Sequence, residues 1–352
     1  MGSWNRGLNY VDGFAGPGEY TGGEEGSPVI ALRVAKTHKI KLRSKIHFLF
    51  VENNQARADH LQSVLSEKYA ELPPGWSTAV VAESFDQRVS GILNRFAEQG
   101  AELAPTLVFV DPFGFAEFPI ETLRRVLGSK HCELFITFMS SFVSRFLEED
   151  RSGALDALFG CSEWRTAKAL TGQARIDFLV QLYEGQLKAI GSTAYVRSFE
   201  IADQNDRPLY HLVFATTSWR GLEVMKEAMF RLDRTGSYRF SDYLGLNQKT
   251  LLDYTGGESG HWGLEVARTM WKAFGGQELR EEAAHRWTIL STRYIYRKKA
   301  ILRPLEMCGA ITGVDPRPRR FTYPSGCVIQ FSPWPGDDAA RRALETGSTP
   351  AP

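Results

Sequence analysis

The sequence has little of what marks several large protein classes. Its four cysteines, at positions 132, 161, 308 and 327, form no Cys-x-x-Cys pair, so neither a cysteine metal site nor a disulfide framework is expected. No apolar run approaches the length of a membrane-spanning helix, and no signal peptide opens the chain, so we expect a cytoplasmic protein with reduced thiols. The formal net charge is +1, which means that any surface for nucleic acid must be local.

Common nucleotide-binding signatures are also missing. The first glycine-rich turn does not follow the pattern G-x-G-x-x-G, and no G-K-[ST] follows it, which argues against a loop that cradles phosphates. No Pro-Cys pair is present, so covalent attack on a pyrimidine ring by a cysteine is not supported. With 43% hydrophobic and 24% charged residues in 352, the chain is typical of a globular protein long enough for two domains.

The chain does have a glycine-rich turn near its amino terminus. A short buried strand is predicted over Leu8–Val11, and Asp12-Gly13-Phe14-Ala15-Gly16-Pro17-Gly18 follows it. Open α/β sheets bind adenosine-containing cofactors at such a turn, where glycine lets the backbone approach a ligand. We expect Asp12, Phe14, Ala15, Gly16 and Gly18 to bind a cofactor with an amino-acid tail. Asp12 would face the ammonium or sulfonium group that S-adenosylmethionine carries; the alternative is an ordinary loop after a core strand.

Acidic side chains follow four successive predicted strands. Asp12 ends the first, Glu52 ends the apolar run Ile46–Val51, Glu83 or Asp86 follows Thr78–Ala82, and Asp111 follows Thr106–Val110. The carboxyl ends of parallel strands lie at one rim of a sheet, so we expect these carboxylates to converge.

Three interpretations of this rim compete. The acids can hold a cofactor, bind a divalent metal for nuclease chemistry, or simply terminate strands. The glycine turn favours the cofactor, with Glu52 at the ribose hydroxyls, Asn53 as a further cofactor-binding residue, and Ser84 and Phe85 at the adenine. For Ser84 and Phe85 the alternative is a capped helix start with a core phenylalanine.

A candidate acceptor site lies at Asp111-Pro112-Phe113-Gly114. Methyl transfer to an exocyclic amine needs an acceptor for the amine hydrogens and a flat wall for the base. We expect the Asp111 carboxylate and the Pro112 carbonyl to accept those hydrogens, and Phe113 or Phe115 to stack on the base. The alternative is a tight loop with two core phenylalanines.

Alternating strands and helices predict an α/β fold, with a mostly parallel sheet and an antiparallel hairpin formed by Tyr195–Ile201 and Leu209–Thr216. The predicted organisation is a Rossmann-like domain over 1–230, an irregular linker over 231–260, a winged-helix-like domain over 261–335 and a disordered tail over 336–352. In the second domain we expect helices over Trp262–Phe274, Leu279–Ala284 and Tyr294–Cys308, with Pro304 kinking or shortening the last. Two short strands are expected over Arg320–Tyr323 and Cys327–Phe331.

The predicted helix over Tyr294–Cys308 and the residue before it are strongly basic. The candidate contacts with a nucleic-acid backbone are Arg293, Arg297, Lys298, Lys299 and Arg303. A solvated helix face or a protein-binding wing is the alternative.

These motifs resemble the three-Cys-motif partner protein (TcmP) family. The resemblance covers Tyr10–Tyr20 with Gly26-Ser27-Pro28, then Phe50-Val51-Glu52 and Val110–Gly114. It continues through Thr216, Gly221 and Met225 to Arg297–Ile311. It implies a class I S-adenosylmethionine-dependent methyltransferase fold, with Asp12, Gly16 and Glu52 at the cofactor, Asp111 at the acceptor and a three-Cys-motif protein as partner.

The first motif is also similar to that of a ribosomal RNA adenine-N6 methyltransferase family. That family has a D-P-P-Y site, whereas this chain has Phe113 in place of the second proline and Gly114 in place of the aromatic residue. The leading hypothesis is methyl transfer to an amino group of a nucleic acid or a nucleotide-derived substrate. A non-catalytic binding module is the second hypothesis, and a magnesium-dependent nuclease the third.

Overall fold

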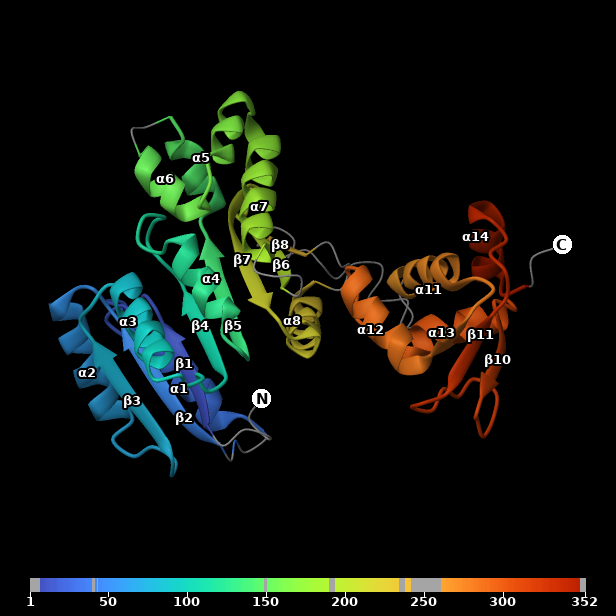
Figure 1. The fold of residues 1–352 in the computed structure, drawn as a ribbon, viewed down its shortest axis with the longest axis horizontal. Helices are drawn as coiled ribbons and strands as arrows, with labels where there is room; N and C mark the ends of the chain where they lie inside the picture. Colours follow the sequence, from blue (N-terminus) through green and yellow to red (C-terminus); the bar gives the residue numbers. More distant parts are fainter. Residues whose placement is uncertain are drawn as a thin grey trace. The chain divides into compact units, whose positions relative to one another are not determined.

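The computed structural model describes residues 7–39, 42, 44–148, 151–189, 194–233, 238–241 and 261–348 (Figure 1). The chain divides into two compact units, Met1–Leu222 and Glu223–Pro352. Most of the predicted linker at 231–260 lies outside the described residues.

The first unit is built on one sheet, and the strands of this unit run in the order β3-β2-β1-β4-β5-β7-β6 (Figure 1). Strands β1 to β5 pair in parallel, and β7 pairs antiparallel with both β5 and β6. The predicted α/β class, with its mostly parallel sheet and antiparallel hairpin, is confirmed. The strands are β1 (Gly7–Asp12), β2 (Lys45–Val51), β3 (Trp76–Val81), β4 (Thr106–Val110), β5 (Cys132–Phe138), β6 (Tyr195–Ala202) and β7 (Pro208–Thr216).

Helices connect the strands and cover the sheet. They are α1 (Ser27–Thr37), α2 (Gln55–Lys68), α3 (Phe85–Glu98), α4 (Ile120–Gly128), α5 (Ser140–Phe146), α6 (Ser152–Phe159), α7 (Gly172–Lys188) and the 3-10 helix η1 (Glu163–Ala169). The apolar run of β2 divides between two cores. Phe48 and Phe50 join one with Leu32 and Leu61, whereas Val51 joins the other. Successive residues of a strand point to opposite faces of the sheet. Because β2 contributes side chains to a core on each face, most of its residues are apolar, and this run predicts the strand.

Helix α8 (Trp219–Leu232) runs across the division between the two units. The second unit further contains β8 (Arg239–Ser241), α11 (His261–Phe274), β9 (Glu278–Arg280), α12 (Glu281–Ser291), α13 (Lys298–Met307), β10 (Ile311–Asp315), β11 (Val328–Phe331) and α14 (Asp337–Thr346). Strand β11 lies between β10 and β9, and both pairings are antiparallel.

Several predictions for the second unit were wrong. Leu279 lies in β9 rather than in a helix, because it pairs with Ile329 of β11. The strand preceding β11 is Ile311–Asp315, not Arg320–Tyr323. Helix α13 begins only at Lys298 and continues past Pro304 to Met307. The expected disordered tail contains α14, whose Ala340, Ala343 and Leu344 are buried.

Candidate functional site

The acidic rim forms where four parallel strands end side by side. In the register of the sheet, Asp12 of β1 lies opposite Phe50 of β2 and Phe109 of β4, so Glu52 and Asp111 each follow two residues beyond Asp12 on either side of it. Both carboxylates are near enough for their charges to contribute to the raised pKa of Asp12. The structure therefore brings together residues that are about one hundred positions apart in the chain.

Asp12 is completely enclosed, with an exposed fraction of 0%. One carboxylate oxygen accepts a hydrogen bond from the Phe14 backbone N–H at 3.2 Å, and the other accepts one from the Ser27 hydroxyl at 2.6 Å. The pKa of Asp12 is raised to about 7, mainly by burial and to a smaller extent by the charges of Asp111 and Glu52, against the lowering effect of these two hydrogen bonds. Asp12 thus joins the glycine turn to the start of α1, and its carboxylate is not exposed to solvent.

Glu52 holds the other side of the turn. Its Oε2 accepts from the Gly16 backbone N–H at 3.0 Å, and its Oε1 accepts from the Asn54 backbone N–H at 2.9 Å. The Arg57 guanidinium lies 3.4 Å from Oε1. Each carboxylate oxygen has two lone pairs, so Glu52 can still accept a hydrogen bond at either oxygen.

The turn needs glycine at two positions for different reasons. A Cβ on Gly13 would lie 2.4 Å from Cδ2 of Phe85, so no side chain fits there without displacing that ring. Gly18 has a φ of 83°, and a Cβ there would lie 2.7 Å from Cδ1 of Leu61. The backbone therefore passes close to α2 and α3 at the rim of the sheet.

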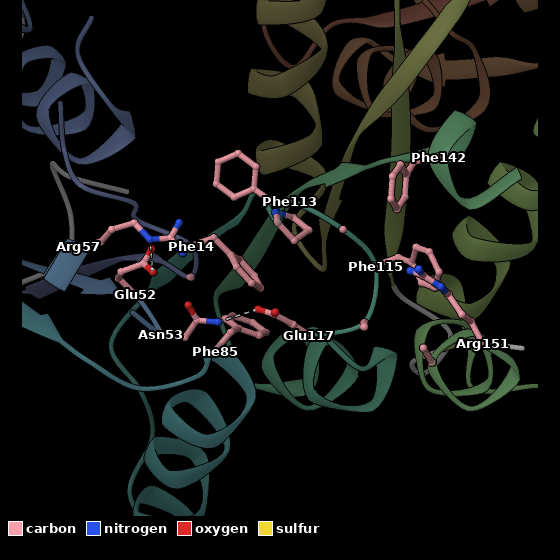
Figure 2. Close-up of a pocket in the computed structure, with 15 residues that line it drawn as sticks. Phe14, Glu52, Asn53, Arg57, Phe85, Phe113, Phe115, Glu117, Phe142 and Arg151 are labelled. Carbon is pink, nitrogen blue, oxygen red and sulfur yellow. Dashed lines mark hydrogen bonds and ion pairs between the residues drawn. The ribbon is translucent and has the colours of Figure 1, made fainter. Parts of the chain in front are cut away.

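A pocket of about 240 Å³ opens beside the turn (Figure 2). Of the predicted site residues, Phe14, Glu52, Asn53, Phe85, Pro112 and Phe113 line it. The other predicted residues, Asp12, Ala15, Gly16, Gly18, Ser84 and Asp111, are not among the lining residues of the described chain. The pocket is slightly smaller than the roughly 300–1,000 Å³ usual for small-molecule sites.

The wall nearest the turn is aromatic. Phe14 stacks on Phe85 with ring centroids 5.7 Å apart and meets Phe118 edge-on at 6.2 Å. Phe85 is only 2% exposed, so little of the ring that the sequence assigns to the adenine is open to a ligand. Ser84 accepts a hydrogen bond from the Gln87 backbone N–H and caps α3. Of the two interpretations of Ser84 and Phe85, the structure matches the capped helix start with a core phenylalanine rather than an open adenine site.

The loop after β4 forms the other wall of the pocket. Burial among the surrounding residues raises the pKa of Asp111 although its side chain reaches the surface, and a hydrogen bond with Thr137 opposes that shift. Phe113 is 79% exposed, whereas Phe115 is buried. Of these two phenylalanines, Phe113 has the ring that is open to an incoming base.

Four further lining residues with charged or aromatic side chains escaped the sequence-based prediction: Arg57, Glu117, Phe142 and Arg151. The Asn53 amide donates to Glu117 at 3.2 Å across the pocket (Figure 2). The Arg151 guanidinium lies 6.0 Å from the Phe115 ring and 4.8 Å from the Phe146 ring. Arg57 lies in the first turn of α2, five residues after Glu52, and Phe142 and Arg151 lie in a stretch with no recognised motif.

A metal centre finds no support at this rim. Within the ranges that the structure describes, no group of three or more histidine, cysteine, aspartate or glutamate side chains is arranged to hold a metal ion. The carboxylates of Asp12 and Glu52 are instead engaged by hydrogen bonds of the protein itself.

No family model matches the chain, and no curated protein matches it either. Among solved structures, the chain is similar over 59% of its length to Trm1 from Pyrococcus horikoshii in complex with S-adenosyl-L-methionine, at 9% identity and a TM-score of 0.36. The match spans about half, 49%, of the Trm1 chain. The chain is also similar to the O-methyltransferase TomG from Streptomyces achromogenes in complex with SAM, over 60% of this chain and 74% of that one, at 13% identity and a TM-score of 0.33.

A third similar structure is an rRNA methylase from Streptococcus thermophilus, matched over 60% of this chain and 87% of that one, at 10% identity and a TM-score of 0.30. At such scores these similarities add nothing to the strand order itself. That order, β3-β2-β1-β4-β5-β7-β6 with β7 reversed, forms the mostly parallel Rossmann-like sheet with an antiparallel hairpin that the sequence predicts.

Proposed function

We propose that the first unit is a methyltransferase that binds S-adenosylmethionine in the pocket beside the glycine turn. The observation that carries this proposal is the pair of contacts at Glu52. This carboxylate holds the backbone of Gly16 in the turn after β1, and the same side chain lines the pocket at the end of β2. In doubly wound sheets the acidic residue at this position holds ribose hydroxyls.

The residues present fit such a cofactor in charge and in shape. Asp12, Glu52 and Asp111 lie close enough together for the charges of Glu52 and Asp111 to add to the effect of burial on the pKa of Asp12, and Arg57 lies beside Glu52. A sulfonium or ammonium group nearby would be attracted by this charge. Glu52 would hold the ribose hydroxyls, and Phe14 would form the flat wall at the adenine. When bound, the cofactor supplies an electrophilic methyl group.

The acceptor side is formed by the loop after β4. The Asp111 carboxylate and the Pro112 carbonyl would accept the hydrogens of an amino group, and the exposed Phe113 ring would stack on the base. We therefore propose an amino group of a nucleic acid or of a nucleotide-derived substrate as the acceptor. Membership of the three-Cys-motif partner family, a three-Cys-motif protein as partner and a cytoplasmic location remain proposals from the resemblance and from composition. In the described residues, no helix is both long and apolar enough to span a bilayer.

A non-catalytic binding module is the second candidate. Phe14 and Phe85 stack on each other beside the turn, where the adenine ring would lie, and this observation favours it. The third hypothesis, a magnesium-dependent nuclease, has no supporting metal cluster among the described residues.

Transfer of a labelled methyl group distinguishes the two candidates. The full chain is incubated with methyl-labelled S-adenosylmethionine and with RNA, DNA and nucleotide pools, and incorporation is compared for wild type, Asp111→Asn and the exposed control Asp59→Asn. We expect incorporation into one pool, reduced by about 10- to 100-fold in Asp111→Asn, which loses one hydrogen-bond acceptor to the amine. No incorporation into any pool would favour the binding module.

A further inference from the structure

The second unit contains two consecutive helices followed by an antiparallel β-pair. Helix α12 is followed by α13, and β10 and β11 then pair with each other and with β9. In helix-turn-helix proteins the second of two such helices enters the major groove of DNA. Helix α13 and the 316–327 loop, which joins β10 to β11, stand in the positions of a recognition helix and a wing.

Helix α13 exposes a basic side and buries an apolar one. Ala300, Ile301 and Leu305 are buried, whereas Lys299 and Arg303 are exposed. Since Lys299 and Arg303 are four residues apart, they lie on the same face of the helix.

The 316–327 loop adds further positive charge beside this helix. Arg319 and Arg320 are exposed. The guanidinium carbon of Arg303 in α13 lies 5.3 Å from the Phe321 ring, and that of Arg320 in the loop lies 4.8 Å from it. Two like charges are therefore held on one aromatic ring, which joins helix and loop into a single surface. We call Lys299, Arg303, Arg319, Arg320 and Phe321 the basic face.

Phe321 adopts a φ of 61°, which bulky side chains rarely adopt. Such backbone outliers cluster at functional positions, because the surrounding structure must hold them in place. In this conformation the ring of Phe321 contacts both Arg303 and Arg320.

Other basic residues of this region are already paired with carboxylates. Arg297 makes a two-pronged ion pair with Glu227 at 2.5 and 2.8 Å, and Lys298 lies 3.0 Å from Glu281. Arg317 lies 2.5 Å from Glu306, which is 3.8 Å from Arg320. In the described ranges, no carboxylate lies within ion-pairing distance of Lys299, Arg303 or Arg319. Of the predicted nucleic-acid contacts, Arg297 and Lys298 are thus largely neutralised.

We propose that the basic face binds duplex DNA, with α13 in the major groove and the 316–327 loop against the phosphate backbone. The major groove of B-form DNA, about 12 Å wide, admits an α-helix, whereas that of A-form RNA is too narrow. This inference deepens the proposed function by naming DNA as the nucleic acid. It rests on the proposed function only in linking this surface to methyl transfer, because DNA binding by the basic face needs no cofactor.

The test is fluorescence anisotropy with the full chain, without S-adenosylmethionine, and a labelled random-sequence duplex of about 20 base pairs, two helical turns. Wild type is compared with Lys299→Gln/Arg303→Gln and with Arg319→Gln/Arg320→Gln. Arg341→Gln/Arg342→Gln on α14, which removes two exposed arginines of the same unit, is the matched control. Thermal unfolding of each variant verifies that it is folded.

We expect each basic-face variant to bind about tenfold or more weakly. Arg319→Gln/Arg320→Gln should also reduce the slope of log K against log salt by about two, one for each lost phosphate contact. The control should bind like wild type. The proposal is overturned if the chain does not bind the duplex, if the control loses as much affinity as the basic-face variants, or if duplex or single-stranded RNA binds more tightly than DNA. Loss of methyl transfer with DNA binding intact would instead refute the proposed function alone.

Discussion

At the scale of single residues, Asp12 is the most informative side chain of the first unit. Its folded-state pKa of about 7 lies above the ordinary value of 3.8, so the folded chain binds more protons than the unfolded chain between these pH values. The contribution of Asp12 to stability is therefore fully present below about pH 4 and is lost as the pH rises towards 7. The desolvated carboxylate of Asp12 destabilises the fold at neutral pH. We infer that Asp12 serves the site at the acidic rim rather than the stability of the fold.

Asp12→Asn tests this directly. Asparagine has nearly the same shape, and it can accept from the Phe14 N–H and donate to the Ser27 hydroxyl, so both contacts survive. We expect the free energy of unfolding, measured with urea, to rise in the variant relative to wild type as the pH increases from 4 to 7. At pH 7 the difference should be on the order of 3 to 4 kcal/mol. Asp59→Asn should show no such change. If the free energies of unfolding of Asp12→Asn and wild type changed in parallel with pH, the pKa of Asp12 would not be raised in the folded chain.

At the scale of elements, the connection from β1 to α1 depends on close passage of the turn beside α2. Gly18 and Gly23 have similar backbone conformations, with φ of 83° and 86°. A Cβ at Gly18 meets the buried Leu61, whereas a Cβ at Gly23 meets nothing within 4 Å.

Alanine at these two positions separates backbone strain from crowding. Both substitutions should lower the free energy of unfolding by about 1–2 kcal/mol, because alanine is strained in a left-handed conformation. Gly18→Ala should lower it by roughly 1–3 kcal/mol more, because the new methyl group displaces Leu61. Chemical denaturation of the two variants measures the difference. Equal losses of stability would mean that the turn does not pass as close to α2 as the structure has it.

The sequence predicted elements well where one physical signal dominated. Buried parallel strands such as Ile46–Val51 are recognisable from their apolar runs alone. Elements decided by distant partners were missed. Leu279 has no local strand signal and becomes extended only by pairing with β11. The small residues of α14 suggested disorder, yet Ala340, Ala343 and Leu344 recur at helical spacing and bury one face.

At the scale of the whole molecule, the sequence predicted where the site lies better than what each residue does. The acids converge because parallel strands end at one rim, which follows from strand order. Which acids reach the pocket depends on side-chain burial, and strand order does not determine this. Asp12 is enclosed while Glu52 lines the cavity. Phe142 and Arg151 reach the pocket from a segment between β5 and β6 that carries no motif.

The central claim is that the pocket beside the glycine turn holds S-adenosylmethionine through Glu52. Calorimetric titration of S-adenosylmethionine into the full chain, with Glu52→Gln and Asp59→Asn alongside, tests it most directly. We predict saturable binding to wild type and to Asp59→Asn, and binding about tenfold or more weaker to a folded Glu52→Gln, because a charged hydrogen-bond acceptor is lost. The absence of binding to the folded wild-type chain, or equal affinity in Glu52→Gln, would contradict the claim.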